Sequence, residues 1–202
     1  MNATTSTERI LTRKISGVES AALLCPGPSL PTTWHDDIFD DFGMVVGVNT
    51  VAKVFRVHYM FGVDRHIVTP VLERKQKMPE IALVTSRVYC GKAMQSKIGT
   101  ILIDRILGPK SDPKRPPVVC AWTMPNALKF CLDNAKRVEI HGMDFAAGDD
   151  FSGQRGCHKP IRWHQESDWL KKVWVKDRIT VYGRVPQVVL EYIAGERKAW
   201  PL

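Results

Sequence analysis

The stretch AALLCPGPSL, residues 21–30, decides the fold. An apolar run stops abruptly at a Gly-Pro-Ser turn, which is typical of a buried strand that delivers a tight turn to the edge of a sheet. Gly27 lets the backbone approach a ligand closely, and Ser29 offers a hydroxyl as well as the N–H groups of the helix expected after it. Cys25 and Pro26 stand where the dinucleotide fingerprint requires glycine, and no GxxxxGK[ST] string occurs. The turn is therefore a candidate cradle for a nucleotide or phosphate; the alternative is a strand-ending turn that binds nothing.

Short apolar runs alternate with segments of helical periodicity through most of the chain. Strands are predicted at residues 44–48, 59–63, 81–84, 118–121, 138–141 and 179–182. Helices are predicted at residues 66–77, 123–135, 168–174 and 187–194. Loops are predicted at residues 108–117 and 146–164, the second as an active-site lid. The alternation predicts an α/β domain with a Rossmann-like, mainly parallel sheet and helices on both faces.

The composition matches one ordinary globular domain. The 202 residues are 44% hydrophobic and 25% charged, and no apolar run approaches the ~20 residues of a membrane-spanning helix. We expect a mobile tail at residues 1–18, a nucleotide-binding domain at 19–195 and a C-terminal tail at 196–202. The five cysteines are scattered and odd in number, which favours reduced thiols in the cytoplasm. The oligomeric state stays open.

The chain is basic, with a net charge of +8 at pH 7 and a pI of about 9.4. This charge favours a polyanionic partner such as a nucleotide, a nucleic acid or an anionic glycan. A solvated basic face is the alternative.

Ligands of parallel α/β sheets bind beyond the carboxyl ends of the strands. Residues at the predicted strand ends include Gly27, Ser29, Asn49, Asp64 and Asp144. Asp144 either orients a nucleotide or a metal, or caps the turn that follows it. His141, also at a strand end, is interpreted as a partly buried histidine that is bonded within the fold.

A zinc site is not expected. Cys157, His158 and His164 are permissible ligands, but their spacing matches no familiar tetrahedral pattern.

The strand ends resemble those of the bacterial CMP-sialic-acid-dependent sialyltransferases, whose first strand ends in G-N-G-P-S-L and whose second ends in C-N. The matching strings are CPGPSL and GVN. Residues 122–145, WTMPNALKFCLDNAKRVEIHGMDF, resemble that family's helix–strand unit ending in S-G-I-D-F. The string HQESDWLKKV resembles the segment that begins with the family's catalytic histidine. A hydroxymethylpterin pyrophosphokinase-like group also contains GPSL, so the resemblance implies a nucleotide-binding α/β fold in either case.

The resemblance implies roles for individual residues. Gly27 and Ser29 would lie against the nucleotide phosphates, and Asn49 would bind the phosphate or the ribose. Asp64 stands roughly where the family places a second asparagine, and a carboxylate there suits a ribose hydroxyl or Mg²⁺. The turn at Thr123 would cover the base and ribose, with the N–H groups of the following helix beside it.

His164 would be the general base that takes a proton from the acceptor hydroxyl, and His158 is its rival in the same segment. The family stabilises the departing phosphate with tyrosines, which the segment before His164 lacks. The cations that could replace them are Arg155, Lys159 and Arg162. Pro26 replaces a family asparagine and so removes one phosphate contact.

These observations predict a nucleotide-binding transferase, glycosyltransferase-like, that moves a sugar from a nucleotide-activated donor to a hydroxyl acceptor such as modified DNA. This reaction needs no cofactor. One alternative is pyrophosphoryl or phosphoryl transfer with Mg²⁺ held by Asp64 and Asp144. Another is a catalytically inert module that binds nucleotides or nucleic acid, which Pro26 and the missing tyrosines favour.

Overall fold

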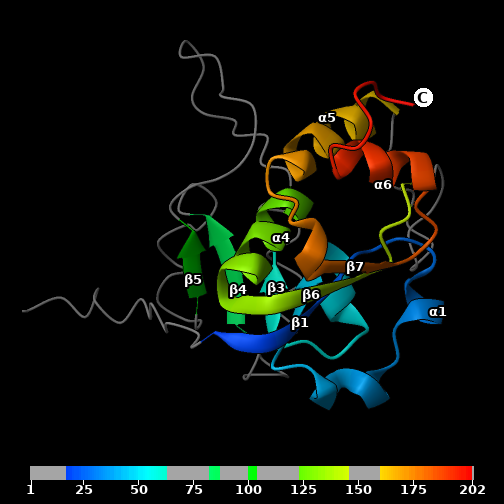
Figure 1. The fold of residues 1–202 in the computed structure, drawn as a ribbon. Helices are drawn as coiled ribbons and strands as arrows, with labels where there is room; N and C mark the ends of the chain where they lie inside the picture. The colour runs from blue at the N-terminus through cyan, green and yellow to red at the C-terminus, as the bar shows by residue number, and fades with distance from the viewer. Residues whose placement is uncertain (1–16, 63–81, 87–99, 104–122, 146–159, 202) are drawn as a thin grey trace, which may run out of the picture.

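Seven parallel strands form the sheet of the computed structural model, which describes residues 17–62, 82–86, 100–103, 123–145 and 160–201 (Figure 1). The strands are β1 (Val18–Leu24), β2 (Met44–Val48), β3 (Tyr59–Phe61), β4 (Ala82–Ser86), β5 (Thr100–Ile103), β6 (Ala135–His141) and β7 (Ile179–Tyr182). Their order is β5-β4-β3-β2-β1-β6-β7, and every neighbouring pair is parallel. The chain therefore builds outward from β1 on one side and continues with β6 on the other, which is the Rossmann-like arrangement. The predicted fold class is confirmed.

Helices cover both faces of the sheet (Figure 1). One face carries α4 (Thr123–Asn134), α5 (Pro160–Lys171) and α6 (Gln187–Ile193). Of these, α4 packs against β1, β2 and β6, and α5 packs against α4 and α6. The other face carries α1 (Leu30–Thr33) and η2 (Asp36–Asp41). Two further short helices are η3 (Asn49–Lys53) and η4 (Lys176–Arg178).

The central strand β1 is buried because its side chains alternate between two cores. Ala21 and Leu23 belong to the core that contains Leu128 of α4. Ala22 and Leu24 belong to the core on the opposite face. A strand with a helix layer on each side reads as a continuous apolar run, which is why residues 21–24 predict it well.

Most predicted elements inside the described residues are present. β2 and β7 have the predicted bounds, and α4 and α6 each end one residue before the predicted end. β5 is an addition, since periodicity alone does not separate a four-residue apolar run from part of a helix. The helix predicted at 66–77, the strand at 118–121, the loop at 108–117 and residues 1–16 lie outside the described residues.

The helix predicted at 168–174 lies earlier, because α5 runs from Pro160 to Lys171. The predicted lid, residues 146–164, is therefore wrong for its last five residues, which are helical. A proline is well accommodated in the first turn of a helix, where its missing N–H would have no intrahelical partner. Pro160 thus begins the helix, and His164 lies on a helix instead of a loop.

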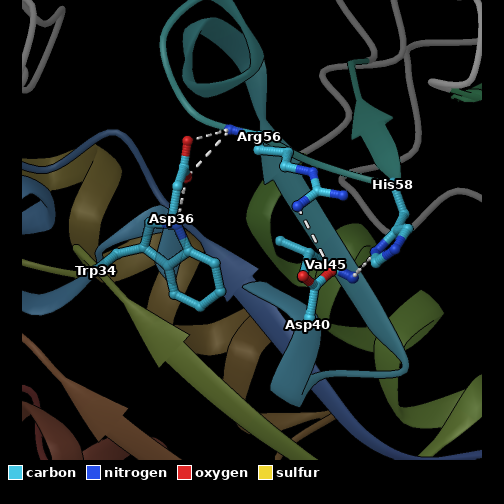
Figure 2. Close-up of polar contacts among 6 residues, drawn as sticks. All are labelled: Trp34, Asp36, Asp40, Val45, Arg56 and His58. Atoms are coloured by element: carbon cyan, nitrogen blue, oxygen red, sulfur yellow. Dashed lines mark hydrogen bonds and ion pairs between the residues drawn. The ribbon is translucent and has the colours of Figure 1, made fainter. Parts of the chain in front are cut away.

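A polar cluster ties η2 to the segment between β2 and β3 (Figure 2). The Asp36 carboxylate accepts the Arg56 backbone N–H, with the nitrogen 3.2 Å from each oxygen, and Trp34 Nε1–H at 3.2 Å. The Arg56 guanidinium lies 3.4 Å from the Asp40 carboxylate and 3.9 Å from the centre of the Phe39 ring. These contacts fix how the chain returns from α1 to the amino end of β2.

His58 accepts a backbone hydrogen bond between the amino ends of β2 and β3. Val45 N–H donates to its Nδ1 at 3.0 Å, so the neutral ring carries its proton on Nε2 (Figure 2). Burial lowers the pKa of His58 from its ordinary value of 6.5, and the nearby Arg56 lowers that pKa further. Folding therefore favours the neutral ring.

We expect the protein to lose stability as the pH falls from about 7.5 to about 5.5, because the unfolded state takes up a proton on His58 more readily than the folded state does. His58→Asn places an amide oxygen near the position of Nδ1 but does not titrate in this range. Its free energy of unfolding, measured by urea denaturation, should fall less over the same window. Equal losses in the two proteins would contradict this assignment.

Candidate functional site

Asp144 joins three segments through hydrogen bonds at the carboxyl edge of the sheet. It follows β6 and is 4% exposed. Its Oδ2 accepts Ser29 N–H at 2.6 Å, and its Oδ1 accepts both the Ser29 hydroxyl and Arg184 N–H, the latter at 2.8 Å. Because Ser29 follows β1 and Arg184 follows β7, one carboxylate connects the loops after three adjacent strands. We call Asp144, with its bonds to Ser29 and Arg184, the carboxylate clamp. It lies where the strand order reverses between β1 and β6, the place at which open α/β sheets bind their ligands.

The close packing around Asp144 requires glycine at two positions. A Cβ atom on Gly27 would lie 2.2 Å from the Gly142 carbonyl oxygen and 2.5 Å from Asp144 Oδ2. Gly142 has a φ of 69°, in the left-handed region that favours glycine, and its own Cβ would lie 2.4 Å from the Cys25 carbonyl oxygen. Gly27 N–H donates to the Gly142 oxygen at 2.9 Å. The fold therefore needs both glycines, whether or not a ligand approaches them.

The turn after β1 uses its backbone donors within the fold. Its three prolines, Pro26, Pro28 and Pro31, have no N–H. The other residues from 25 to 34 donate to main-chain oxygens or to Asp144, namely Cys25, Gly27, Ser29, Leu30, Thr32, Thr33 and Trp34. The Ser29 hydroxyl also donates to Asp144. A phosphate held at this turn must therefore find its donors on other segments.

Asn49 follows β2 in a rarely used backbone conformation. Its φ of 54° lies in the left-handed region, which asparagine enters more readily than most residues. The register of β1 and β2 pairs Leu24 with Gly47, so Asn49 lies at the same edge as Pro26. Its Oδ1 is buried and has no hydrogen-bond donor within the part of the chain that the structure describes. An unpaired buried oxygen is costly, and a ligand donor would satisfy it.

Thr123 begins α4 and is 9% exposed. Since α4 leads back to the amino end of β6, its first turn faces the carboxyl edge of the sheet. The N–H groups in the first turn of a helix have no intrahelical acceptor and attract anions. The predicted contact at Thr123 thus lies on an element directed at the candidate site.

His164 lies in a second polar cluster, on the outer helices. Its Nε2 is 3.8 Å from Asp168 Oδ1, one helical turn later, and the Tyr192 hydroxyl of α6 donates a hydrogen bond to the same oxygen. This bond raises the pKa of Tyr192 to about 12. The ring of Trp200, in the segment expected as a C-terminal tail, stacks on His164 at 5.1 Å between centroids. The side chains of His164 and Asp168 are 42% and 46% exposed, so the pair can be reached from solvent.

The structure places His164 and Asp144 in separate clusters. The first turns of α5 lie towards the carboxyl edge, because α5 connects two parallel neighbours, β6 and β7. The contacts described for His164 are nevertheless with α5, α6 and Trp200. A substrate that used both clusters would have to span from the sheet edge to the outer helices.

His141 was expected to be partly buried and bonded within the fold, but it is fully buried, and its Nε2 has no hydrogen-bond partner among the described residues. It is 2% exposed, and its Nδ1 donates to the Thr33 carbonyl oxygen at 2.7 Å. The ring stacks on Tyr182 at 4.8 Å between centroids. Burial lowers the pKa of His141, so the neutral ring is favoured.

Several predicted site residues lie outside the described residues: Asp64, Arg155, Cys157, His158 and Lys159. Arg162 lies in the first turn of α5. In the described ranges, no group of three or more His, Cys, Asp and Glu side chains is arranged to hold a metal ion. Since three donors already occupy the Asp144 carboxylate, Mg²⁺ would have to compete with bonds that the fold uses.

Three residues were missed by the sequence reasoning: Asp168, Tyr192 and Arg184. The spacing of four residues between His164 and Asp168 would have indicated their contact if the helix had been predicted there. Tyr192 and Arg184 carry no local signal, because their partners are 24 and 40 residues away in the chain.

Comparisons with family models, with curated proteins and with solved structures gave no match to this chain. Of the helices described, none is long and apolar enough to cross a membrane.

Asp144→Ala should lower the free energy of unfolding by several kcal/mol, because a buried donor left without an acceptor costs about 1–3 kcal/mol and three donors would be affected. The matched control is Asp133→Ala, which removes an exposed carboxylate paired with Lys129 and should cost less than about 1 kcal/mol. Urea denaturation measures both changes. Similar losses in the two variants would show that the clamp is not what holds this edge together.

Proposed function

We propose that the protein binds a nucleotide-activated sugar at the carboxyl edge between β1 and β6 and transfers the sugar to a hydroxyl acceptor. The observation that carries this proposal is the polar edge at the reversal of strand order, built by Asp144, Asn49 and the first turn of α4. The resemblance of CPGPSL and GMDF to the sialyltransferase motifs supports the same class of ligand.

The proposed chemistry is direct displacement at the sugar. The acceptor hydroxyl gives its proton to His164 while its oxygen forms a bond to the anomeric carbon. The bond from that carbon to the phosphate oxygen breaks, and the electron pair leaves with the nucleotide. Asp168, 3.8 Å from the His164 ring, offers the resulting imidazolium a counter-charge. We propose Arg155, Lys159 and Arg162 as cations for the leaving phosphate, so the reaction requires no metal.

We further propose a polyanionic acceptor, with DNA as the first case to test. Its support is the net charge of +8. Binding of duplex DNA should weaken steeply between low and physiological salt, because neutralised phosphates release counterions. A flat salt response would remove DNA from the proposal.

Calorimetric titration with CMP, CDP, UDP, GDP, ADP and ATP, each with and without Mg²⁺, tests the proposal. Binding of a nucleoside phosphate that does not depend on Mg²⁺ is the expected result, and the preferred base identifies the donor. Binding that requires Mg²⁺ and a triphosphate would replace the proposal with pyrophosphoryl transfer. Absence of binding to every nucleotide would overturn it and leave an inert module.

His164→Ala should reduce turnover of the donor by about 10²- to 10⁴-fold, the usual contribution of a general base, and leave the nucleotide affinity unchanged. The matched control is His35→Ala, which alters an exposed histidine beside η2, on the opposite face of the sheet. Release of the leaving nucleotide, a monophosphate or a diphosphate according to the donor, measures turnover. Unchanged turnover in His164→Ala would exclude His164 as the base.

A further inference from the structure

Arg184 is fixed beside the candidate site by its own backbone. Its N–H donates to Asp144 Oδ1 at 2.8 Å, the same oxygen that accepts the Ser29 hydroxyl. Arg184 and the turn after β1 are therefore immediate neighbours across one carboxylate, although they are far apart in the chain.

Gly183, the residue before Arg184, leaves little room for the backbone to shift. A Cβ atom on Gly183 would lie 2.9 Å from the Met143 carbonyl oxygen and 3.2 Å from Asp144 Oδ1. The chain thus passes tightly over the end of β6 and then presents Arg184. The Cα position of this arginine is set by the clamp, while its side chain is exposed.

The guanidinium of Arg184 is not engaged in the way that two neighbouring basic groups are. Arg178 donates to the Leu132 and Lys136 carbonyl oxygens, and Lys176 pairs with Glu196. For Arg184, no carboxylate partner is found among the described residues. A cation held at a ligand-binding edge without a protein counter-charge is suited to an anionic ligand.

The turn after β1 cannot itself balance the charge of a phosphate, so a cation is needed beside it. Its N–H groups and the Ser29 hydroxyl are engaged within the fold, and the Asp144 carboxylate adds negative charge at the same place. A phosphate there would be repelled unless a cation offset this charge. Arginine meets that need with a planar set of donors that matches two phosphate oxygens.

We propose that Arg184 binds the phosphate of the nucleotide ligand at the carboxyl edge of the sheet. This inference rests on the proposed function, because it assigns a contact within the same site. Arg184 replaces the backbone donors that the turn after β1 does not offer.

The experiment measures the affinities of wild type, Arg184→Ala and Arg184→Lys for CMP, UMP, GMP and AMP and for the four corresponding nucleosides. Truncating the side chain leaves the backbone bond to Asp144 in place, and thermal unfolding verifies that the fold is kept. Arg184→Ala should weaken binding of the preferred monophosphate by about tenfold to a hundredfold, the range for a hydrogen bond to a charged group, and leave nucleoside binding unchanged. Arg184→Lys should fall between wild type and Arg184→Ala, because lysine keeps the charge and loses the bidentate geometry.

The matched control is Arg197→Ala, an exposed arginine after α6, which should bind every ligand as wild type does. Unchanged monophosphate affinity in Arg184→Ala, or equal weakening of monophosphate and nucleoside, would overturn the role of Arg184 while the proposed function stands. Failure of wild type to bind any of these monophosphates or any nucleotide of the calorimetric titration above would overturn the proposed function, and the role of Arg184 with it.

Discussion

The Asp144 carboxylate is the interaction on which the carboxyl edge of this sheet depends. After the last backbone hydrogen bonds between neighbouring parallel strands, the chain has no regular pairing. The loops that follow therefore need other hydrogen-bond partners. Here a single buried side chain supplies those partners to the loops after β1 and β7. The near contact of Gly27 with Gly142 is part of the same arrangement, because it brings the β1 loop within reach of the carboxylate.

In this arrangement the backbone groups of the turn hold the fold, and only side chains are left to bind a ligand. In phosphate loops that precede a helix, free backbone N–H groups bind the ligand and the fold holds them in place. In this protein the equivalent N–H groups hold the fold, and three prolines reduce their number further. A ligand at this edge would then be recognised by side chains around the turn, of which Asn49 has an unpaired oxygen within the described residues and Arg184 has an exposed cation.

The sheet and several residues at its carboxyl edge could be predicted from local pattern, but the contacts between those residues could not. Residues 44–48 and 179–182 are bounded by turn residues and carry the residue types that strands favour, so their bounds are found without knowledge of the fold. The start of α5 was misread because the glycine- and charge-rich composition before it predicts a loop as far as His164, whereas Pro160 is well placed in the first turn of a helix. Ser29 and Asp144 are 115 residues apart, and nothing in either neighbourhood encodes their contact. The glycine at 27 was expected to face a ligand, yet the structure shows a protein neighbour that already requires it.

The contact between Gly27 and Gly142 has a consequence for how this sequence can diverge. Positions 27, 29, 142 and 144 share one packed volume, so a change at any of them alters the space or the donors left for the others. A side chain at position 27 would occupy the place of the carboxylate, and loss of the carboxylate would leave the buried serine without its acceptor. In sequences descended from this one, these four positions should be conserved together or substituted together. The residues around them can be substituted independently.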